Sequence, residues 1–280
     1  MKNIIWLASY PKSGNTWCRT LISNLTVDAE VHINDLKTDS IASKRDMFDA
    51  LTLINSSDLS YDEIDVIRPQ VYNSYAKEAA QTLYIKVHDA YTLNLDQQPI
   101  FPQESSRGVV YIVRTPLDVV TSYAAHSNAT IDETIAHLGD HDHCMSNKTT
   151  GISTGNQFRQ KLLTWSEHVL SWTTQMAIPL LLVKYEDLHN QPVDTVIKLA
   201  EFCGITHDKA SVLRAIELSQ FNRLQQQEKE AGFREKPQFM QTGFFRKGII
   251  GSWQEELSSA QANQIIADHH QVMQQLGYLP

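Results

Sequence analysis

A buried strand, a tight turn and the start of a helix follow one another at the beginning of this chain. Residues 4–8 are a continuous apolar run, typical of a buried strand, and Tyr10-Pro11 then turns the chain. Apolar residues recur at helical spacing from Trp17 to Leu25. The N–H groups and dipole of a helix N-terminus bind anions, and a lysine in the turn adds a full charge. The sequence therefore predicts a phosphate loop at residues 11–17.

The phosphate loop (residues 11–17) is not the common loop of nucleoside triphosphatases. That loop needs Gly-Lys followed by Ser or Thr, whereas here Lys12 precedes Gly14 and the chain contains neither Gly-Lys-Ser nor Gly-Lys-Thr. Tyr-Pro-Lys-Ser-Gly-Asn-Thr-Trp instead resembles the 5′-phosphosulfate loop of sulfotransferases that use 3′-phosphoadenosine 5′-phosphosulfate (PAPS), which usually have Thr at the position of Asn15. The resemblance implies that six consecutive residues bind the nucleotide: Lys12, Ser13, Gly14, Asn15, Thr16 and Trp17.

A second segment resembles the 3′-phosphate signature of the same family. Residues 108–113 are another apolar run of strand type, and Pro116 suits the first turn of a helix that follows. Arg114 stands where the strand ends, and Ser122 lies about two helical turns further along. The resemblance implies that Arg114 and Ser122 hold the phosphate on the ribose, and an arginine fork matches a phosphate by paired hydrogen bonds.

Three further segments extend the resemblance. Residues 246–253 resemble the family's C-terminal Arg-Lys-Gly-x-x-Gly-x-Trp loop, which implies that the 3′-phosphate site is completed by Arg246, Lys247 and Gly248. Lys184-Tyr185-Glu186-Asp187 resembles a segment whose tyrosine contacts the nucleotide, so Tyr185 is the expected contact and the two acids are expected to be structural. Ser219-Gln220-Phe221 resembles Thr-Ser-Phe, which implies that Ser219 contacts the nucleotide and that Phe221 stacks on adenine opposite Trp17.

Two catalytic candidates, Lys86 and His88, lie in or directly after one more strand-like segment, residues 84–87. His88 follows this strand, and ligand sites of open α/β sheets lie at the carboxyl ends of their strands. Lys86-Val87-His88 resembles the family's Lys-x-His, whose histidine is the general base. An acceptor hydroxyl must lose a proton as it attacks sulfur, which a histidine can take up. The resemblance implies catalytic roles for His88, for Lys86 beside the transferring group, and for Lys12 beside the departing 5′-phosphate.

The composition limits what else the chain does. It has 280 residues, of which 42% are hydrophobic, and a net charge of -8, which argues against a nucleic-acid-binding protein. Three cysteines without metal-type spacing favour a reducing, cytoplasmic location, and no apolar run approaches a membrane span of about 20 residues. His141-Asp142-His143-Cys144 has the ligand types of a metal site, but adjacent ligands rarely converge on one ion, so no metal is expected.

Strand-like and helix-like segments alternate, which predicts an α/β fold: a single domain over residues 1–280 with a parallel sheet flanked by helices on both faces, similar to P-loop kinases. Strands are expected at 3–8, 83–87, 108–113 and 180–184. Helices are expected at 16–26, 69–81, 117–126, 158–177, 192–203, 208–216 and 259–275. Residues 127–157 are polar and are expected to form a surface segment or a lid over the acceptor site.

Together, these features predict an enzyme that moves a sulfuryl group from PAPS to a hydroxyl or amine of a small-molecule acceptor, releases 3′,5′-adenosine bisphosphate (PAP), and needs no metal. Two alternatives stay open: an ATP-dependent kinase that uses magnesium on the same fold, and a nucleotide-binding protein without turnover. Residues 27–82 and 127–157 resemble nothing familiar, so the acceptor is not identified. The family's dimer motif is absent from residues 254–263, which leaves the oligomeric state open.

Overall fold

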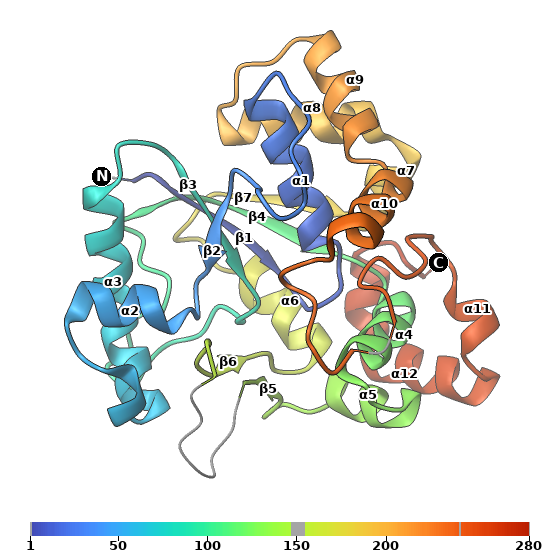
Figure 1. Ribbon diagram of the computed structural model, residues 1–280. Coiled ribbons are helices and arrows are strands. Elements are labelled where there is room, and N and C mark those ends of the chain that lie inside the picture. Colours follow the sequence, from blue (N-terminus) through green and yellow to red (C-terminus); the bar gives the residue numbers. More distant parts are fainter. Residues whose placement is uncertain (1, 147–154, 241, 280) are drawn as a thin grey trace. The chain divides into compact units, whose positions relative to one another are not determined.

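The fold is built on a five-stranded sheet, shown in the computed structural model of Figure 1, which describes residues 2–146, 155–240 and 242–279. The strand order is β2-β3-β1-β4-β7. The strands are β1 (Ile4–Ser9), β2 (Asp39–Ile41), β3 (Leu83–Val87), β4 (Ser106–Val113) and β7 (Leu180–Lys184). β1 and β2 both pair with β3 in parallel, and helices flank the sheet. The predicted α/β fold with a parallel sheet is therefore confirmed.

β1 is buried along its whole length, which explains why its sequence is almost continuously apolar instead of alternating. Trp6 packs edge-on against Tyr72 and Phe101, with ring centroids 5.1 and 5.0 Å away. Its indole N–H donates to the hydroxyl of Ser106 at 2.7 Å, which supplies the partner that a buried indole requires. Trp6 thus ties β1 to the first residue of β4.

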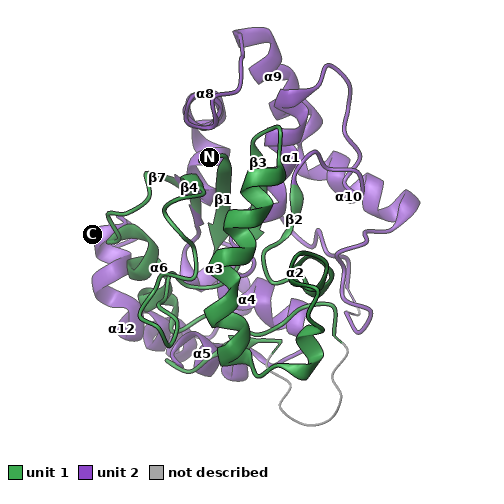
Figure 2. Ribbon diagram, turned by 90° about the vertical axis from the view of Figure 1, so that its left-hand side faces the viewer, with its two compact units in different colours: residues 1–10, 39–111, 141–182 green, residues 11–38, 112–140, 183–280 purple. Residues whose placement is uncertain are grey.

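The chain forms two compact units, each made of three separate segments (Figure 2). Unit 1 comprises residues 1–10, 39–111 and 141–182. Its other elements are α2 (Arg45–Thr52), η1 (Ser56–Asp58), α3 (Tyr61–Glu78), β5 (Cys144–Met145), β6 (Gln160–Lys161) and α6 (Trp165–Thr173). The expected single domain stays a prediction.

Unit 2 comprises residues 11–38, 112–140 and 183–280. Its helices are α1 (Asn15–Thr26), α4 (Pro116–Ser127), α5 (Ile131–Leu138), α7 (Tyr185–Asn190), α8 (Pro192–Cys203), α9 (Lys209–Leu218), α10 (Phe221–Ala231), α11 (Trp253–Glu256) and α12 (Ser259–Gln275). Unit 2 therefore carries the phosphate loop, Arg114 and the C-terminal Arg-Lys pair, whereas β3 and His88 belong to unit 1. None of the helices within the described ranges is long and apolar enough to cross a membrane.

Two of the expected helices are present, but their predicted bounds are wrong. The helix expected at 69–81 begins eight residues earlier, at Tyr61, because a capping box between Ser60 and Glu63 starts it and Pro69 is accommodated inside. The helix expected at 158–177 is interrupted: β6 occupies its first part, and α6 begins at Trp165 after the capping residue Thr164.

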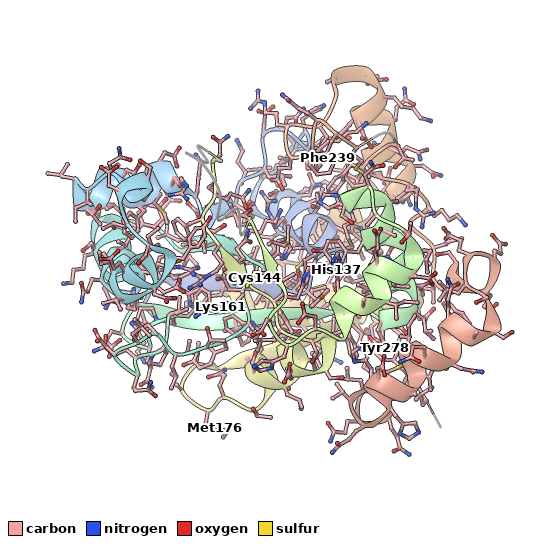
Figure 3. All side chains as sticks on the ribbon, turned by 90° about the horizontal axis from the view of Figure 1, so that it is seen from below. His137, Cys144, Lys161, Met176, Phe239 and Tyr278 are labelled. Carbon is pink, nitrogen blue, oxygen red and sulfur yellow. The ribbon has the colours of Figure 1, made fainter. Side chains whose placement is uncertain are left out.

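The segment expected to be a polar lid contains a regular helix. Thr130 and Glu133 form a reciprocal capping box that starts α5, and this Thr-x-x-Glu pattern is visible in the sequence. β5 follows in the same segment and pairs antiparallel with β6, with Cys144 opposite Lys161 (Figure 3). Residues 147–154 of the expected lid lie outside the described residues, and the lid stays a prediction.

Candidate active site

The phosphate loop leads into α1 through backbone conformations that most residues avoid. Lys12 has a φ of +67°, which is uncommon for a residue with a side chain, and Gly14 at the helix N-cap has a φ of +102°. A Cβ on Gly14 would lie 2.6 Å from a ring carbon of Tyr185. Glycine is therefore needed at this position for both its backbone conformation and its close approach to the tyrosine. The first turn of α1 holds no acidic residue, so its N-terminus suits an anion.

Tyr185, the first residue of α7, packs against Trp17 and Arg114. The ring of Trp17 meets it edge-on at 5.4 Å between centroids, and the guanidinium carbon of Arg114 lies 4.2 Å from the centre of its ring. Burial raises the pKa of Tyr185 and keeps its hydroxyl protonated. Tyr185 therefore contacts Trp17 and Arg114, and Gly14 of the phosphate loop approaches the same ring. The structure thus brings these four predicted nucleotide-binding residues together.

Three of the predicted binding residues carry a buried hydrogen-bond donor that the described protein atoms do not satisfy. These atoms are the hydroxyl of Ser13, the indole nitrogen of Trp17 and Nε of Arg114. Ser13 is fully buried and Arg114 is 7% exposed. An unsatisfied buried donor costs about 1–3 kcal/mol, so such groups are normally paired. A ligand with several acceptor oxygens, such as a phosphorylated nucleotide, fits these donors.

Arg114 also fixes the segment that follows the C-terminal Arg-Lys pair. Its Nη2 donates to the carbonyl of Ile249 at 2.9 Å and lies 3.5 Å from the carboxylate of Asp118. Asp118 is fully buried and accepts hydrogen bonds from the backbone N–H groups of Gly251 and Trp253 at 2.9 and 3.1 Å. Sequence reasoning missed Asp118, although its place one helical turn after Arg114 was a signal. Asp118 holds the C-terminal loop against α4.

Arg246 and Lys247 lie close to α4 and are paired with acids. Nη2 of Arg246 donates to the hydroxyl of Thr121 at 3.3 Å, next to the partly exposed Ser122. Both cations contact Glu256, Arg246 at 2.5 Å and Lys247 at 3.1 Å. The structure thus places Arg246 beside α4, the helix that carries Ser122; that the two share a 3′-phosphate site stays a prediction.

Helix α10 contacts the C-terminal loop that contains Arg246 and Lys247 at two places. Gly248 has a φ of +65°, and a Cβ there would lie 2.1 Å from the ring of Phe221, so the ring rests directly on the backbone. Two turns along the same helix, Glu228 accepts hydrogen bonds from the N–H groups of Phe244 and Phe245 at 2.6 and 2.9 Å. The role of Glu228 was not predicted, because nothing in the sequence around it indicates that it accepts hydrogen bonds from Phe244 and Phe245.

Lys12 lies over the ring of Phe244, with its ammonium nitrogen 3.8 Å from the ring centre. This cation–π contact brings the phosphate loop to the segment that leads into Arg246. Ser219 is placed differently. It is fully buried, and its hydroxyl accepts a hydrogen bond from the Asn24 amide at 3.1 Å. Its predicted contact with the nucleotide stays a prediction.

In unit 1, His88 is held in one tautomer at the end of β3. Its Nδ1 lies 2.9 Å from the carbonyl oxygen of Ser9, and a carbonyl can only accept, so Nδ1 carries the proton. Nε2 then has the lone pair, which is the form that a general base needs. His88 is 7% exposed, and Lys86, two residues before it on the strand, is partly exposed.

Two side chains of α6 fix the backbone at His88 and Asp89. His168 donates from Nε2 to the carbonyl of His88 at 3.1 Å, and the indole of Trp172, one turn later, donates to the carbonyl of Asp89 at 3.0 Å. The hydroxyl of Tyr111 lies 2.8 Å from Nδ1 of His168 and donates to it. Burial lowers the pKa of His168 from 6.5 to about 4, so this histidine is neutral at physiological pH.

The buried His168 should make the protein less stable in mild acid. The unfolded imidazole takes up a proton near pH 6.5, whereas the folded one stays neutral down to about pH 4, so protons favour the unfolded chain within this window. Between pH 7 and pH 5 this group alone should lower the free energy of unfolding by about 2 kcal/mol. Urea unfolding at both pH values measures the loss. His168→Gln, which can still donate to the His88 carbonyl, should show a correspondingly smaller loss; an unchanged loss would contradict the assignment.

The candidate metal ligands at residues 141–144 do not form a cluster. His141 pairs with Glu167 at 2.8 Å between Nδ1 and a carboxylate oxygen, and both side chains are exposed. Within the described ranges, no group of three His, Cys, Asp or Glu side chains is arranged to hold a metal ion.

Residues 2–277 match the family described as the sulfotransferase domain. Sulfotransferase 1B1 of Mus musculus is 25% identical over 281 residues, which cover 96% of this chain and 82% of the relative. Flavonol 3-sulfotransferase of Flaveria bidentis is 26% identical over 263 residues, 90% of this chain and 75% of the relative. Cytosolic sulfotransferase 17 of Arabidopsis thaliana is 25% identical over 270 residues, 91% of this chain and 70% of the relative.

Solved structures share the fold. Mouse sulfotransferase SULT7A1 complexed with PAP superposes with a TM-score of 0.60 at 18% identity, covering 98% of this chain and 85% of that one. Retinol dehydratase in complex with androsterone and inactive cofactor PAP gives a TM-score of 0.63 at 16% identity, with coverages of 98% and 81%.

Proposed function

The chain belongs to the sulfotransferase family, and on this premise we propose that it transfers a sulfuryl group from PAPS to a hydroxyl or amine of a small-molecule acceptor and releases PAP. The observation that carries the proposal is the set of unsatisfied buried donors of Ser13, Trp17 and Arg114. All three belong to residues that the family motifs assign to the nucleotide, and all three would be satisfied by acceptor atoms of the ligand.

The residues of unit 2 bind and orient the nucleotide. The phosphate loop and Lys12 bind the 5′-phosphosulfate, and four side chains hold the 3′-phosphate: Arg114, Ser122, Arg246 and Lys247. Trp17 and Phe221 contact the adenine from opposite faces. Bound PAPS supplies the sulfuryl group and leaves as PAP. Lys12 stabilises the charge that builds up on the departing phosphate, an electrostatic contribution that is usually the largest in such a reaction.

The residues of unit 1 act on the acceptor. Nε2 of His88 takes the proton of the acceptor hydroxyl or amine, and the Ser9 carbonyl stabilises the imidazolium through Nδ1–H. Lys86 neutralises charge on the group being transferred. Side-chain cations supply the positive charge in this scheme, so we expect turnover without a divalent metal. We also propose a cytoplasmic location, which agrees with the sparse cysteines and with the name of the Arabidopsis relative.

Thermal unfolding in the presence of nucleotides tests the proposal. PAP at 100 times its dissociation constant should add about 2.7 kcal/mol to the free energy of unfolding and raise the melting temperature by about 5 °C, with or without magnesium. AMP, which lacks the 3′-phosphate, should give a much smaller shift. A magnesium-dependent shift with ATP alone would favour the kinase. Binding of PAP without transfer to any acceptor in a broad panel would favour the non-catalytic protein.

A further inference from the structure

The predicted 3′-phosphate site contains an internal anion. We propose that Glu256 competes with the 3′-phosphate for Arg246 and thereby sets how tightly the site holds PAP and PAPS. This inference rests on the proposed function, because it assumes that Arg246 and Lys247 bind the 3′-phosphate. Beyond the residues proposed to bind the 3′-phosphate, it identifies one residue, Glu256, that weakens this binding.

The guanidinium of Arg246 already donates hydrogen bonds to protein groups. Nη1 donates to one carboxylate oxygen of Glu256 at 2.5 Å, and Nη2 donates to the other at 3.1 Å. Nη2 also donates to the hydroxyl of Thr121 at 3.3 Å. Both hydrogens of Nη2 are therefore engaged within the protein.

A phosphate that binds an arginine through two parallel hydrogen bonds has two edges to choose from. One edge consists of Nη1 and Nη2, and the other of Nε and Nη2. Both edges include Nη2, so paired binding of the 3′-phosphate to Arg246 must displace either Glu256 or Thr121. Glu256 carries the negative charge that repels the phosphate, so its displacement relieves the larger conflict.

Lys247 is held by the same acids. Its ammonium nitrogen lies 3.1 Å from Glu256 and 3.5 Å from Glu255. The two cations expected to attract the phosphate thus face two carboxylates, and the four charges sum to zero. Burial raises the pKa of the Glu256 carboxyl, but the hydrogen bonds and positive charges of Arg246 and Lys247 together lower this pKa by more, so the competing group is charged at neutral pH.

The two acids differ in how firmly they are placed. The side chain of Glu256 is 22% exposed, whereas that of Glu255 is 78% exposed and pairs with Lys247 at 3.5 Å. Both belong to α11, whose first N–H, that of Trp253, is held by the buried Asp118. α11, which carries Glu256, is therefore anchored through Asp118 to α4, the helix that also carries Ser122. Glu255 provides a matched control of equal charge one residue away.

The test compares the dissociation constants of PAP and AMP for the unmodified protein, Glu256→Gln and Glu255→Gln by isothermal titration calorimetry. Glu256→Gln keeps the shape and an acceptor oxygen but removes the charge, so it should bind PAP about tenfold more tightly, with AMP changed by less than about twofold. Glu255→Gln should change the PAP constant by less than about threefold, because the pair that Glu255 forms with Lys247 is exposed to solvent and therefore strongly screened.

Several outcomes would overturn the inference. Weaker binding of PAP by Glu256→Gln would show that the carboxylate orients Arg246 for the phosphate instead of competing with it. Equal tightening for PAP and AMP would place the effect outside the 3′-phosphate site. Glu256→Ala should also tighten PAP binding, and it provides the test if the glutamine variant does not fold. Failure of the unmodified protein to bind PAP would instead refute the proposed function, so the two failures are distinguishable.

Discussion

Replacing His88 by asparagine should lower kcat by about a thousandfold and leave the dissociation constant of PAP nearly unchanged. The side-chain amide of asparagine can replace Nδ1 and still donate to the Ser9 carbonyl, which lies 2.9 Å from that nitrogen in the unmodified protein. It has no counterpart of Nε2, so only the proton acceptor is removed. Initial rates with whichever phenol or primary alcohol proves the best acceptor, together with PAP titrations, measure both effects.

His207 offers a matched control for this change. Its Nδ1 also lies 2.9 Å from a backbone carbonyl, that of Ile205, but it is placed in the turn before α9 and belongs to no predicted site. His207→Asn should leave kcat and PAP affinity within about twofold of the unmodified protein. If His88→Asn lost PAP binding together with turnover, His88 would be a structural residue, and the base would have to be sought elsewhere.

The strands and the nucleotide loops were predictable because their signals are local. β1, β3, β4 and β7 each contain a continuous apolar run, and the phosphate loop and the Arg114 signature stand directly after two of them. β2 was missed because a three-residue strand at the edge of the sheet has no room for a pattern. α5 was missed although its capping box, Thr130 to Glu133, is in the sequence.

The residues that hold the site together were not predictable in the same way. Asp118 acts on amides more than 130 positions away, and His168 acts on a carbonyl 80 positions away. Periodicity and motif spacing describe neighbours along the chain, whereas these contacts depend on which elements the tertiary fold brings together. A single sequence shows that a charge or a histidine is present, but it does not show which distant backbone group that side chain meets.

Arg68 forms a buried ion pair with an acid distant in sequence. Among the substitutions predicted here, replacing Arg68 should lower the stability of the protein the most. Nη1 and Nη2 of this 1% exposed residue donate to the two carboxylate oxygens of Asp89 at 2.8 and 3.1 Å. Burial raises the pKa of Asp89, and the arginine opposes this effect. Asp65, a second partner of Arg68, keeps Arg159 at 2.8 Å when Arg68 is removed, so Asp89 is the acid left without a cation.

Arg68→Met should therefore lower the free energy of unfolding by about 3–5 kcal/mol. It leaves the charge of Asp89 buried without a partner, and this costs far more free energy than the intact ion pair contributes to stability. Urea unfolding at neutral pH measures the loss. Arg68→Met combined with Asp89→Asn should recover part of it, because the double variant buries no unpaired charge. Lys44→Met is the control: its pair with Asp46 is as short, at 2.6 Å, but is exposed, and should be worth less than about 1 kcal/mol. An equal loss in the single and double variants would show that Arg68 stabilises unit 1 through packing and not through Asp89.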